Sequence, residues 1–282
     1  MMDRRTTPAN GRVAAAHLRG RVAALRYVEG APARIGVPVA DLRRAPDGAR
    51  DRQLLFGAEV TVYERVGGTA FVQAVADDYV GFVPEAALAD PRAATHRVAT
   101  RATHLYEAAD MKSPDLMALG LGARVTVTST SARFAETPDG FVPARHLVQL
   151  DRPEGDPVAV AERLLGTPYL WGGNSSVGID CSGLVQAGLA ACGRACPGDS
   201  DLQERALGTE IPKGDDLRRG DLLFWKGHVG WVADSQTLLH ANAYHMAVAF
   251  EPLDAAIDRI RKQGDGPVTR RVRLSQARQP FR

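Results

Sequence analysis

The sequence predicts an α+β protein in which a strand-rich N-terminal half precedes a mixed domain of helices and strands. Two observations carry this prediction. A pattern of short strands and turns occurs twice between residues 32 and 150, and beyond it the pattern changes to helices followed by strands. The chain has 282 residues, of which 45% are hydrophobic and 24% charged, so it is long enough for two or three folded domains.

Residues 1–31 are expected to form an N-terminal helical arm. Apolar residues recur there at helical spacing, as in Val13, Ala14, Leu18 and Val22. Arginines interrupt every candidate apolar run in this segment, so it is not interpreted as a signal peptide. No run of about 18 apolar residues occurs anywhere, which argues against a membrane span.

Two segments of the N-terminal half repeat each other in the same order. Leu54–Val62 matches Leu119–Val127, and Gly81–Leu88 matches Gly140–Leu147. The two copies differ by a loop-sized deletion, and alternating apolar residues within each predict short strands rather than helices. A duplicated module is therefore expected.

Both copies resemble the bacterial type of SH3 domain, in which an apolar strand follows a glycine turn and an aromatic-Val pair closes the barrel. The resemblance implies two small SH3-like β-barrels, one over residues 32–90 and a second over residues 91–150.

A third domain is expected over residues 151–282, because the Pro- and Asp-rich stretch Leu150–Pro157 marks a boundary. Apolar periodicity and turn residues predict its main elements. These are helices at Val158–Leu165 and Ser182–Ala191, and strands at Leu222–Val232 and Thr237–Ala241.

Cys181 follows a glycine-rich loop and a candidate N-cap, Asp180, which places its sulfur in the first turn of a helix. A helix N-terminus and a neighbouring imidazolium can lower a thiol pKa to roughly 3.5–7.5, so Cys181 is a candidate nucleophile. The alternative is a buried cysteine that serves only as a small hydrophobic residue.

Two histidines could supply the base and its orienting partner. If Ala233–Ser235 connect two strands as a hairpin, Val232 pairs with Gln236 and His228 faces His240. Directly opposed residues have Cβ atoms about 4.5–5.5 Å apart, within reach of a hydrogen bond between imidazoles. A slip of one residue would put the rings on opposite faces of the sheet.

Four blocks of this domain together match the pattern of one family. They are Tyr169–Gly173, Asp180–Gly183, Gly220–Val229 and His240–Ala241. In this pattern the domain resembles the NlpC family of papain-like cysteine peptidases, which hydrolyse bacterial cell-wall peptides. The resemblance implies a papain-like α+β fold over residues 151–282.

By the same resemblance, Cys181 is the nucleophile, His228 the general base and His240 the third residue that orients it. Tyr169 would hydrogen-bond the developing oxyanion together with the backbone N–H of Cys181. No metal or cofactor is implied.

The order of two SH3 domains before an NlpC domain resembles enzymes that cleave γ-D-glutamyl-diamino acid bonds in murein peptides with a free N-terminal L-alanine. The resemblance implies that Asp180 and Ser182 hold the substrate ammonium, with Tyr79 and a glutamate of the first SH3 domain closing the pocket. Glu59 is the candidate glutamate, although it lies one residue later than in relatives, which in a strand reverses its face. The alternatives are N-capping for Asp180 and an exposed strand position for Glu59.

Other chemistries are less well supported. A net charge of +2 does not favour nucleic acid as a partner, and neither His240 with His245 nor Cys192 with Cys196 has a zinc-ligand spacing. Three cysteines suit a reducing compartment. Since no signal peptide is identified either, the resemblance implies recycling of imported wall fragments in the cytoplasm. Two alternatives stay open: an inactive protein that binds wall peptides, and an endopeptidase that acts on intact peptidoglycan.

Overall fold

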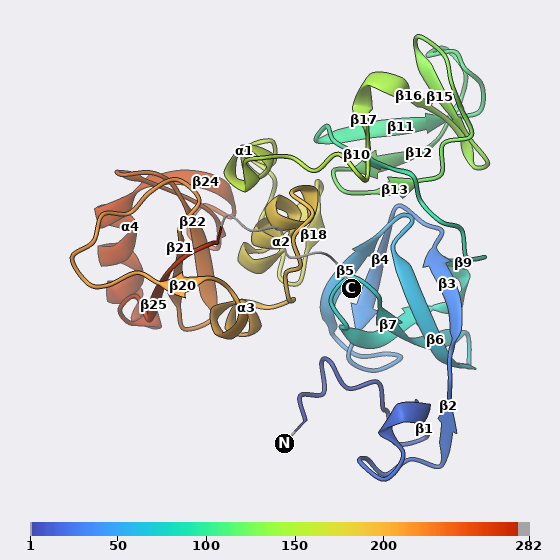
Figure 1. Ribbon diagram of the computed structural model, residues 1–282, viewed down its shortest axis with the longest axis horizontal. Coiled ribbons are helices and arrows are strands. Elements are labelled where there is room, and N and C mark those ends of the chain that lie inside the picture. The colour runs from blue at the N-terminus through green and yellow to red at the C-terminus, as the bar shows by residue number, and fades with distance from the viewer. Residues whose placement is uncertain (1, 276–282) are drawn as a thin grey trace. The chain divides into compact units, whose positions relative to one another are not determined.

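The computed structural model describes residues 2–275 and divides into two compact units, Met1–Asp151 and Arg152–Arg282 (Figure 1). The first unit is rich in β-sheet, and the second combines helices with a six-stranded sheet. Among the described residues, no helix is both long and apolar enough to cross a membrane.

The helical arm predicted over residues 1–31 is wrong. This segment contains strand β1 (Val13–Ala15), a 3-10 helix (Ala16–Leu18) and strand β2 (Arg26–Val28), with β1 and β2 paired in parallel. Gly11 and Gly20 adopt positive φ angles of +84° and +77°, and the residues between them are too few for a stable helix. The strand pairing therefore replaces the helix that the apolar spacing suggested.

The first copy of the repeat forms a seven-stranded sheet with the order β5-β4-β8-β7-β6-β3-β9. A 3-10 helix at Glu85–Ala87 precedes its last strand. The strands are β3 (Ala31–Ile35), β4 (Val39–Arg43), β5 (Arg50–Leu55), β6 (Glu59–Val66), β7 (Thr69–Ala74), β8 (Val80–Pro84) and β9 (Leu88–Ala89).

The second copy has corresponding strand pairs, but they are divided between a three-stranded sheet, β13-β10-β17, and a five-stranded sheet, β12-β11-β16-β15-β14. The strands are β10 (His96–Val98), β11 (Ala102–Tyr106), β12 (Asp115–Gly120), β13 (Arg124–Val125), β14 (Ser129–Thr130), β15 (Phe134–Thr137), β16 (Gly140–Pro143) and β17 (Leu147–Gln149). β11 pairs with β12 and β16 as β4 pairs with β5 and β8, and β10 pairs with β17 as β3 pairs with β9. The two copies therefore share these strand pairs, although the first forms one sheet and the second forms two.

The two copies share buried residues where a turn of the first meets the second. Phe56, directly after β5, is 2% exposed and packs in a cluster with Val98, Leu119 and other core residues of the second copy. Its backbone oxygen accepts a 2.9 Å hydrogen bond from Arg124 N–H. At Gly57, where φ is +75°, an added Cβ would lie 2.1 Å from the Arg124 oxygen, so only glycine fits this contact.

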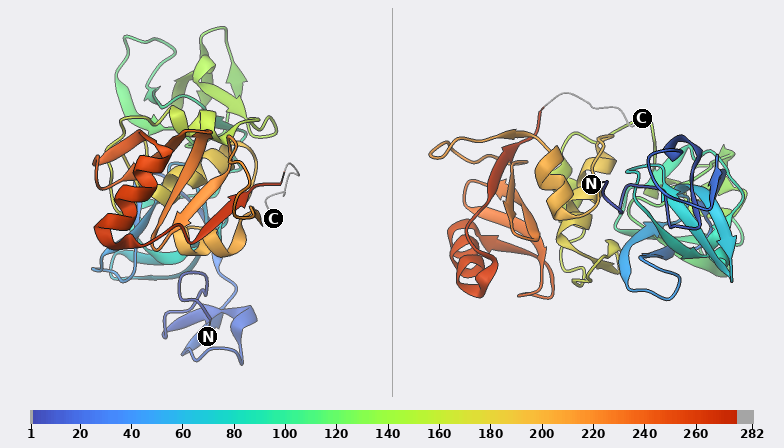
Figure 2. Two further views of the ribbon diagram at one scale, coloured as in Figure 1. Left: turned by 90° about the vertical axis from the view of Figure 1, so that its left-hand side faces the viewer. Right: turned by 90° about the horizontal axis from the view of Figure 1, so that it is seen from below.

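The second unit is built on a sheet with the order β20-β25-β21-β22-β23-β24. Figure 2 shows helices α2 and α4 on opposite faces of this sheet. The helices are α1 (Pro157–Glu162), α2 (Cys181–Ala191), α3 (Ser200–Ala206) and α4 (Leu253–Ile260), the last followed by a π-helical turn at Arg261–Asp265. The strands are β18 (Asn174–Ser175), β19 (Gly178–Ile179), β20 (Thr209–Glu210), β21 (Leu222–Trp225), β22 (His228–Asp234), β23 (Thr237–Asn242), β24 (Ala247–Pro252) and β25 (Arg270–Arg273).

The β22–β23 hairpin forms, but its predicted register is wrong by two residues. Val232 pairs with Leu238 rather than Gln236, and Asp234 pairs with Thr237 after an irregularity at Ala233. The bulged residue shortens the connecting turn and so moves the pairing. Because side chains alternate with a period of two, this shift keeps His228 and His240 on one face, whereas a shift of one would not.

Candidate active site

Cys181 is the first residue of α2, and its side chain is buried, with 7% of the residue exposed. Asp180 caps the helix: its Oδ1 accepts a 2.7 Å hydrogen bond from Gly183 N–H. The glycine-rich loop allows the backbone to approach the helix closely, since a Cβ at Gly183 would lie 2.5 Å from the Gly173 oxygen. The predicted helix N-terminus, cap and loop are therefore present.

Asp180 makes two further hydrogen bonds within the protein. The Ser182 hydroxyl donates to Oδ1 at 2.9 Å, and Gly172 N–H donates to Oδ2 at 2.9 Å. Burial raises the pKa of Asp180 despite these three donors, since none of them carries a charge. N-capping is thus a role that Asp180 has in this structure, whether or not it also binds an ammonium.

The resting thiol is not the low-pKa group expected from its position. Burial, followed by the neighbouring Asp180 carboxyl, raises the pKa of Cys181 to about 12. Hydrogen bonds from the backbone N–H groups of Val229 and Ser182 oppose this shift but do not cancel it. The contact with Val229 places the sulfur beside the start of β22, whose first residue is His228.

The two histidines are directly hydrogen-bonded, with 2.8 Å between His228 Nε2 and His240 Nδ1. Their ring centroids are 5.1 Å apart. His240 is fully buried and His228 half-buried. Burial lowers the pKa of both imidazoles, that of His240 to about 4, so both are neutral at physiological pH.

A carboxylate and a guanidinium that the sequence analysis missed extend this pair. Glu251 Oε2 lies 3.1 Å from His240 Nε2, and Arg259 donates to both carboxylate oxygens at 2.7 Å. Glu251 lies on β24, where it pairs with Leu238, and Arg259 lies on α4. The recurrence of Leu253, Ala256 and Ile260 at helical spacing was a signal for α4, although not for its ion pair.

Tyr169 lies near the nucleophile, as the resemblance implied. Its backbone N–H donates to the Met246 oxygen at 2.9 Å, which fixes the segment that carries it. Burial raises the pKa of its phenol, and the charges that Cys181 and Asp180 would carry raise it further. Tyr169 is therefore a neutral hydroxyl that can donate a hydrogen bond.

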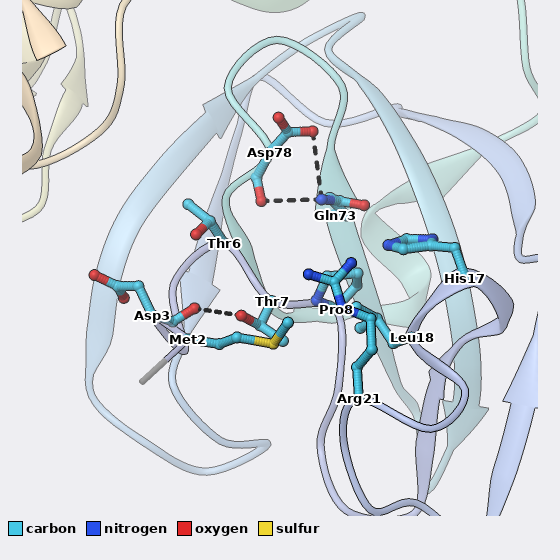
Figure 3. Close-up of a pocket in the computed structure, with 10 residues that line it drawn as sticks. All are labelled: Met2, Asp3, Thr6, Thr7, Pro8, His17, Leu18, Arg21, Gln73 and Asp78. Carbon is cyan, nitrogen blue, oxygen red and sulfur yellow. Dashed lines mark hydrogen bonds between the residues drawn. The ribbon is translucent and has the colours of Figure 1, made fainter.

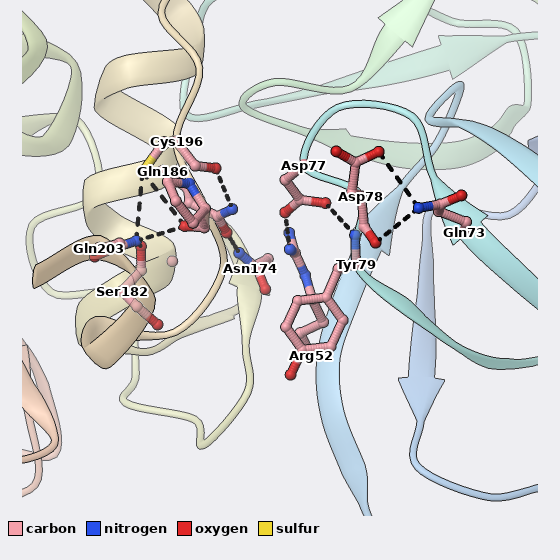
Figure 4. Close-up of polar contacts among 12 residues, drawn as sticks. Arg52, Gln73, Asp77, Asp78, Tyr79, Asn174, Ser182, Gln186, Cys196 and Gln203 are labelled. Atoms are coloured by element: carbon pink, nitrogen blue, oxygen red, sulfur yellow. Dashed lines mark hydrogen bonds and ion pairs between the residues drawn. The ribbon is translucent and has the colours of Figure 1, made fainter. Parts of the chain in front are cut away.

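Gln203 fixes the loop before α3 against the start of α2 (Figure 4). It is fully buried, and its side-chain amide donates to the backbone oxygens of Ser182 at 2.9 Å and Pro197 at 3.0 Å. This loop contains Gly198, and Asp199 in it adopts a φ of +57°. The amide thus positions the residues that flank the cysteine.

The remaining two predicted site residues belong to the first unit. Tyr79 is 1% exposed, packs in the core of the first copy and has the Arg52 guanidinium 5.1 Å from its ring centroid (Figure 4). Glu59, the first residue of β6, is exposed. The contact of either residue with a substrate stays a prediction.

The first unit also contains a cavity of about 410 Å³ beside the N-terminal segment (Figure 3). His17, Arg21, Gln73 and Asp78 are among its lining residues. None of the eight predicted site residues is among the described residues that line it.

Comparisons with known proteins match a segment of each unit to a family. Residues 166–261 match the NlpC/P60 family, and residues 42–88 match the bacterial dipeptidyl-peptidase SH3 domain. The chain therefore carries an NlpC/P60 domain and one SH3 domain of this type. The second copy lies outside the matched residues, and its identity as an SH3 domain stays a prediction.

Several curated relatives are peptidases by name. A probable endopeptidase of Mycobacterium bovis is 34% identical over 125 residues, covering 42% of this chain and 32% of the relative. The γ-D-glutamyl-L-lysine dipeptidyl-peptidase of Bacillus subtilis is 42% identical over 85 residues, covering 27% of this chain and 28% of the relative. The chain thus spans about a third of the length of the curated relatives it matches.

A solved NlpC/P60 family protein from Bacillus cereus has a similar fold, with a TM-score of 0.72 at 21% identity. The match covers 86% of this chain and 99% of the other. A likeness at this identity concerns the fold alone.

Proposed function

We propose that this chain is a cysteine peptidase that hydrolyses the γ-D-glutamyl-diamino acid bond of wall peptides with a free N-terminal L-alanine. The observation that carries the proposal is the buried Cys181 thiol beside β22, with His228 at the start of that strand hydrogen-bonded to His240. The relative from Bacillus subtilis named for this bond supports the choice of substrate.

The reaction begins from a neutral thiol and a neutral imidazole. His228 accepts the thiol proton as the Cys181 sulfur attacks the γ-glutamyl carbonyl, and Tyr169 with the Cys181 backbone N–H stabilises the oxyanion. His228 then gives the proton to the amine of the diamino acid, the C–N bond breaks, and a thioester remains. Water, deprotonated by His228, hydrolyses the thioester and restores the thiol.

The raised thiol pKa has a consequence for this sequence of steps. The resting pair holds little thiolate at neutral pH, so proton transfer accompanies the attack rather than preceding it. Substrate binding can favour the transfer, because an ammonium beside Asp180 would neutralise the carboxyl that raises the thiol pKa.

Recognition of the free amine is the part of the proposal that defines the substrate class. Asp180 would accept a charge-assisted hydrogen bond from the L-alanine ammonium, with Ser182, Tyr79 and Glu59 as further contacts. A cytoplasmic location, suited to imported wall fragments, belongs to the same proposal and is tested by cell fractionation.

The test is hydrolysis of L-Ala-γ-D-Glu-diaminopimelate by the purified protein, followed by chromatography of the released amine. Wild-type protein and Cys192→Ala should cleave the peptide, and Cys181→Ala should not, since only the nucleophile is removed. Cleavage that survives in Cys181→Ala would rule out the mechanism.

A second candidate, endopeptidase action on intact peptidoglycan, is favoured by the similarity to the probable endopeptidase of Mycobacterium bovis. An N-acetylated peptide separates the two functions. Selective cleavage of the free-amine peptide supports the proposed function, whereas equal cleavage of both supports the endopeptidase. Peptide binding without cleavage of either would instead indicate a wall-peptide-binding protein.

A further inference from the structure

The histidine pair ends in a buried ion pair that gives each hydrogen bond a definite direction. Arg259 can only donate, and it donates to Glu251 Oε1 and Oε2 at 2.7 Å. Glu251 is 8% exposed, and the guanidinium lowers the pKa of its carboxyl, so both oxygens are acceptors. The nitrogen that faces this carboxylate, His240 Nε2 at 3.1 Å, must therefore carry a proton.

The proton on His240 Nε2 also determines which nitrogen donates in the hydrogen bond between the two histidines. A neutral imidazole has one N–H, so His240 Nδ1 is an acceptor. Its hydrogen-bond partner is His228 Nε2 at 2.8 Å, and this nitrogen must then donate. The lone pair of a neutral His228 consequently lies on Nδ1, the nitrogen that the histidine pair leaves free for the thiol.

We propose that Glu251 and Arg259 are positioning residues that set the direction of this relay and keep the basic lone pair of His228 on Nδ1. The two residues have different tasks. Glu251 selects which nitrogen of His240 is protonated. Arg259 neutralises the carboxylate, so that Glu251 does not draw a second proton onto His240.

The second task follows from what a doubly protonated His240 would do. An imidazolium donates from both nitrogens, so His228 Nε2 would have to accept and its proton would move to Nδ1. His228 could then no longer take a proton from Cys181. The charge on Arg259 opposes this state, as does the nearby His245, because each lowers the pKa of His240.

The guanidinium is itself held in place. Arg259 Nη1 donates to Gln263 Oε1 at 2.7 Å, and its Cζ lies 4.4 Å from the Tyr244 ring centroid. With its side chain only 16% exposed, this arginine has little freedom to leave Glu251. The hydrogen bonds therefore run from His228 through His240 and Glu251 to Arg259 on α4.

The first test is the tautomeric state of the wild-type protein, read from ¹⁵N–¹H correlation spectra of the histidine rings at pH 7.5. We expect His228 and His240 both to be Nε2–H tautomers. A proton on Nδ1 of either ring would overturn the inference. This measurement needs no variant and no substrate, so it stands even if no test peptide is cleaved and the proposed function fails.

The second test uses variants and rests on the proposed function for its activity readout. Glu251→Leu should lower kcat by about 10²–10⁴-fold with KM little changed, and His240 should become a mixture of tautomers. Arg259→Lys keeps the charge but not the two parallel hydrogen bonds to Glu251, so it should lower kcat less than Glu251→Leu does. Arg219→Met is the matched control, since it breaks ion pairs to Asp156 and Glu162 away from the site and should leave both readouts unchanged.

The outcomes separate positioning from simple stabilisation. A folded Glu251→Leu protein with wild-type tautomers, or with kcat within threefold of wild type, would contradict the inference. If Glu251→Leu does not fold, Arg259→Met decides: the inference requires a larger loss of kcat at pH 6 than at pH 8, because His240 then gains its second proton more readily. An equal loss at both pH values would contradict it.

Discussion

Two carboxylates in the candidate site have pKa values that shift in opposite directions. One precedes the candidate nucleophile, and the other is hydrogen-bonded to His240. Asp180, at the start of α2, accepts hydrogen bonds from two backbone N–H groups and one hydroxyl. Glu251, on β24, accepts from a guanidinium and an imidazole. The pKa of Asp180 is raised and that of Glu251 is lowered.

The difference shows that neutral donors do not replace a counter-charge where burial disfavours a charged carboxylate. Three hydrogen bonds leave the Asp180 carboxylate destabilised, whereas Arg259 more than compensates the burial of Glu251. Among residues 2–275 no cation is paired with Asp180, although Glu251 has one. A substrate ammonium would give Asp180 a positive counter-charge, as Arg259 does for Glu251.

The largest effect should come from removing the internal counter-charge. Arg259→Met leaves the buried Glu251 carboxylate uncompensated and should lower the free energy of unfolding by about 3–5 kcal/mol. Asp180→Asn should cost less than about 1 kcal/mol, since asparagine caps helices as well as aspartate does. Urea unfolding followed by circular dichroism measures both, and equal losses would remove the distinction between the two carboxylates.

A smaller and selective effect is expected on catalysis. Asp180→Asn should lower kcat/KM for the free-amine peptide by about 10–100-fold, because a hydrogen bond to a charged group contributes about 1.5–3 kcal/mol. The kcat/KM of this variant for the N-acetylated peptide should change little. The matched control is Asp156→Asn, which alters the N-cap of α1 and should leave both peptides unaffected. An equal loss on both peptides in Asp180→Asn would show that Asp180 acts only on the fold.

The smallest effect of a substitution is expected on the alkylation rate of the free thiol. Because its pKa is raised to about 12, alkylation of resting Cys181 by iodoacetamide should accelerate about tenfold per pH unit from pH 7 to pH 10. Asp180→Asn removes a charge that raises this pKa and should speed alkylation several-fold at pH 8. Mass spectrometry of the labelled peptide measures the rate, and a plateau below pH 8 in wild-type protein would refute the assigned direction.

The common face of His228 and His240 could be predicted from the sequence, even though the register of strands β22 and β23 could not. Alternation along a strand depends on whether a shift is odd or even, so the two-residue error at Val232 preserved the common face of His228 and His240. The Asp180 cap and the start of α2 were predictable for a similar reason, since both depend on local sequence.

Features that depend on burial or on distant partners were not predictable in this way. The thiol pKa was expected to be low from the helix N-terminus, but desolvation outweighs that effect. Glu251 and Arg259 were missed because β24 has no clear alternation and their contact with His240 arises only in the folded sheet. In the N-terminal arm, paired strands replaced a helix that apolar spacing alone had favoured.

The placement of Phe56 limits how this chain can be divided. Its ring belongs to the core of the second copy although its backbone belongs to the first, and Gly57 leaves no room for a side chain at that junction. A truncation after residue 90 would expose that ring to water and leave the remaining copy prone to self-association. The two copies should therefore be produced together when this half of the chain is engineered.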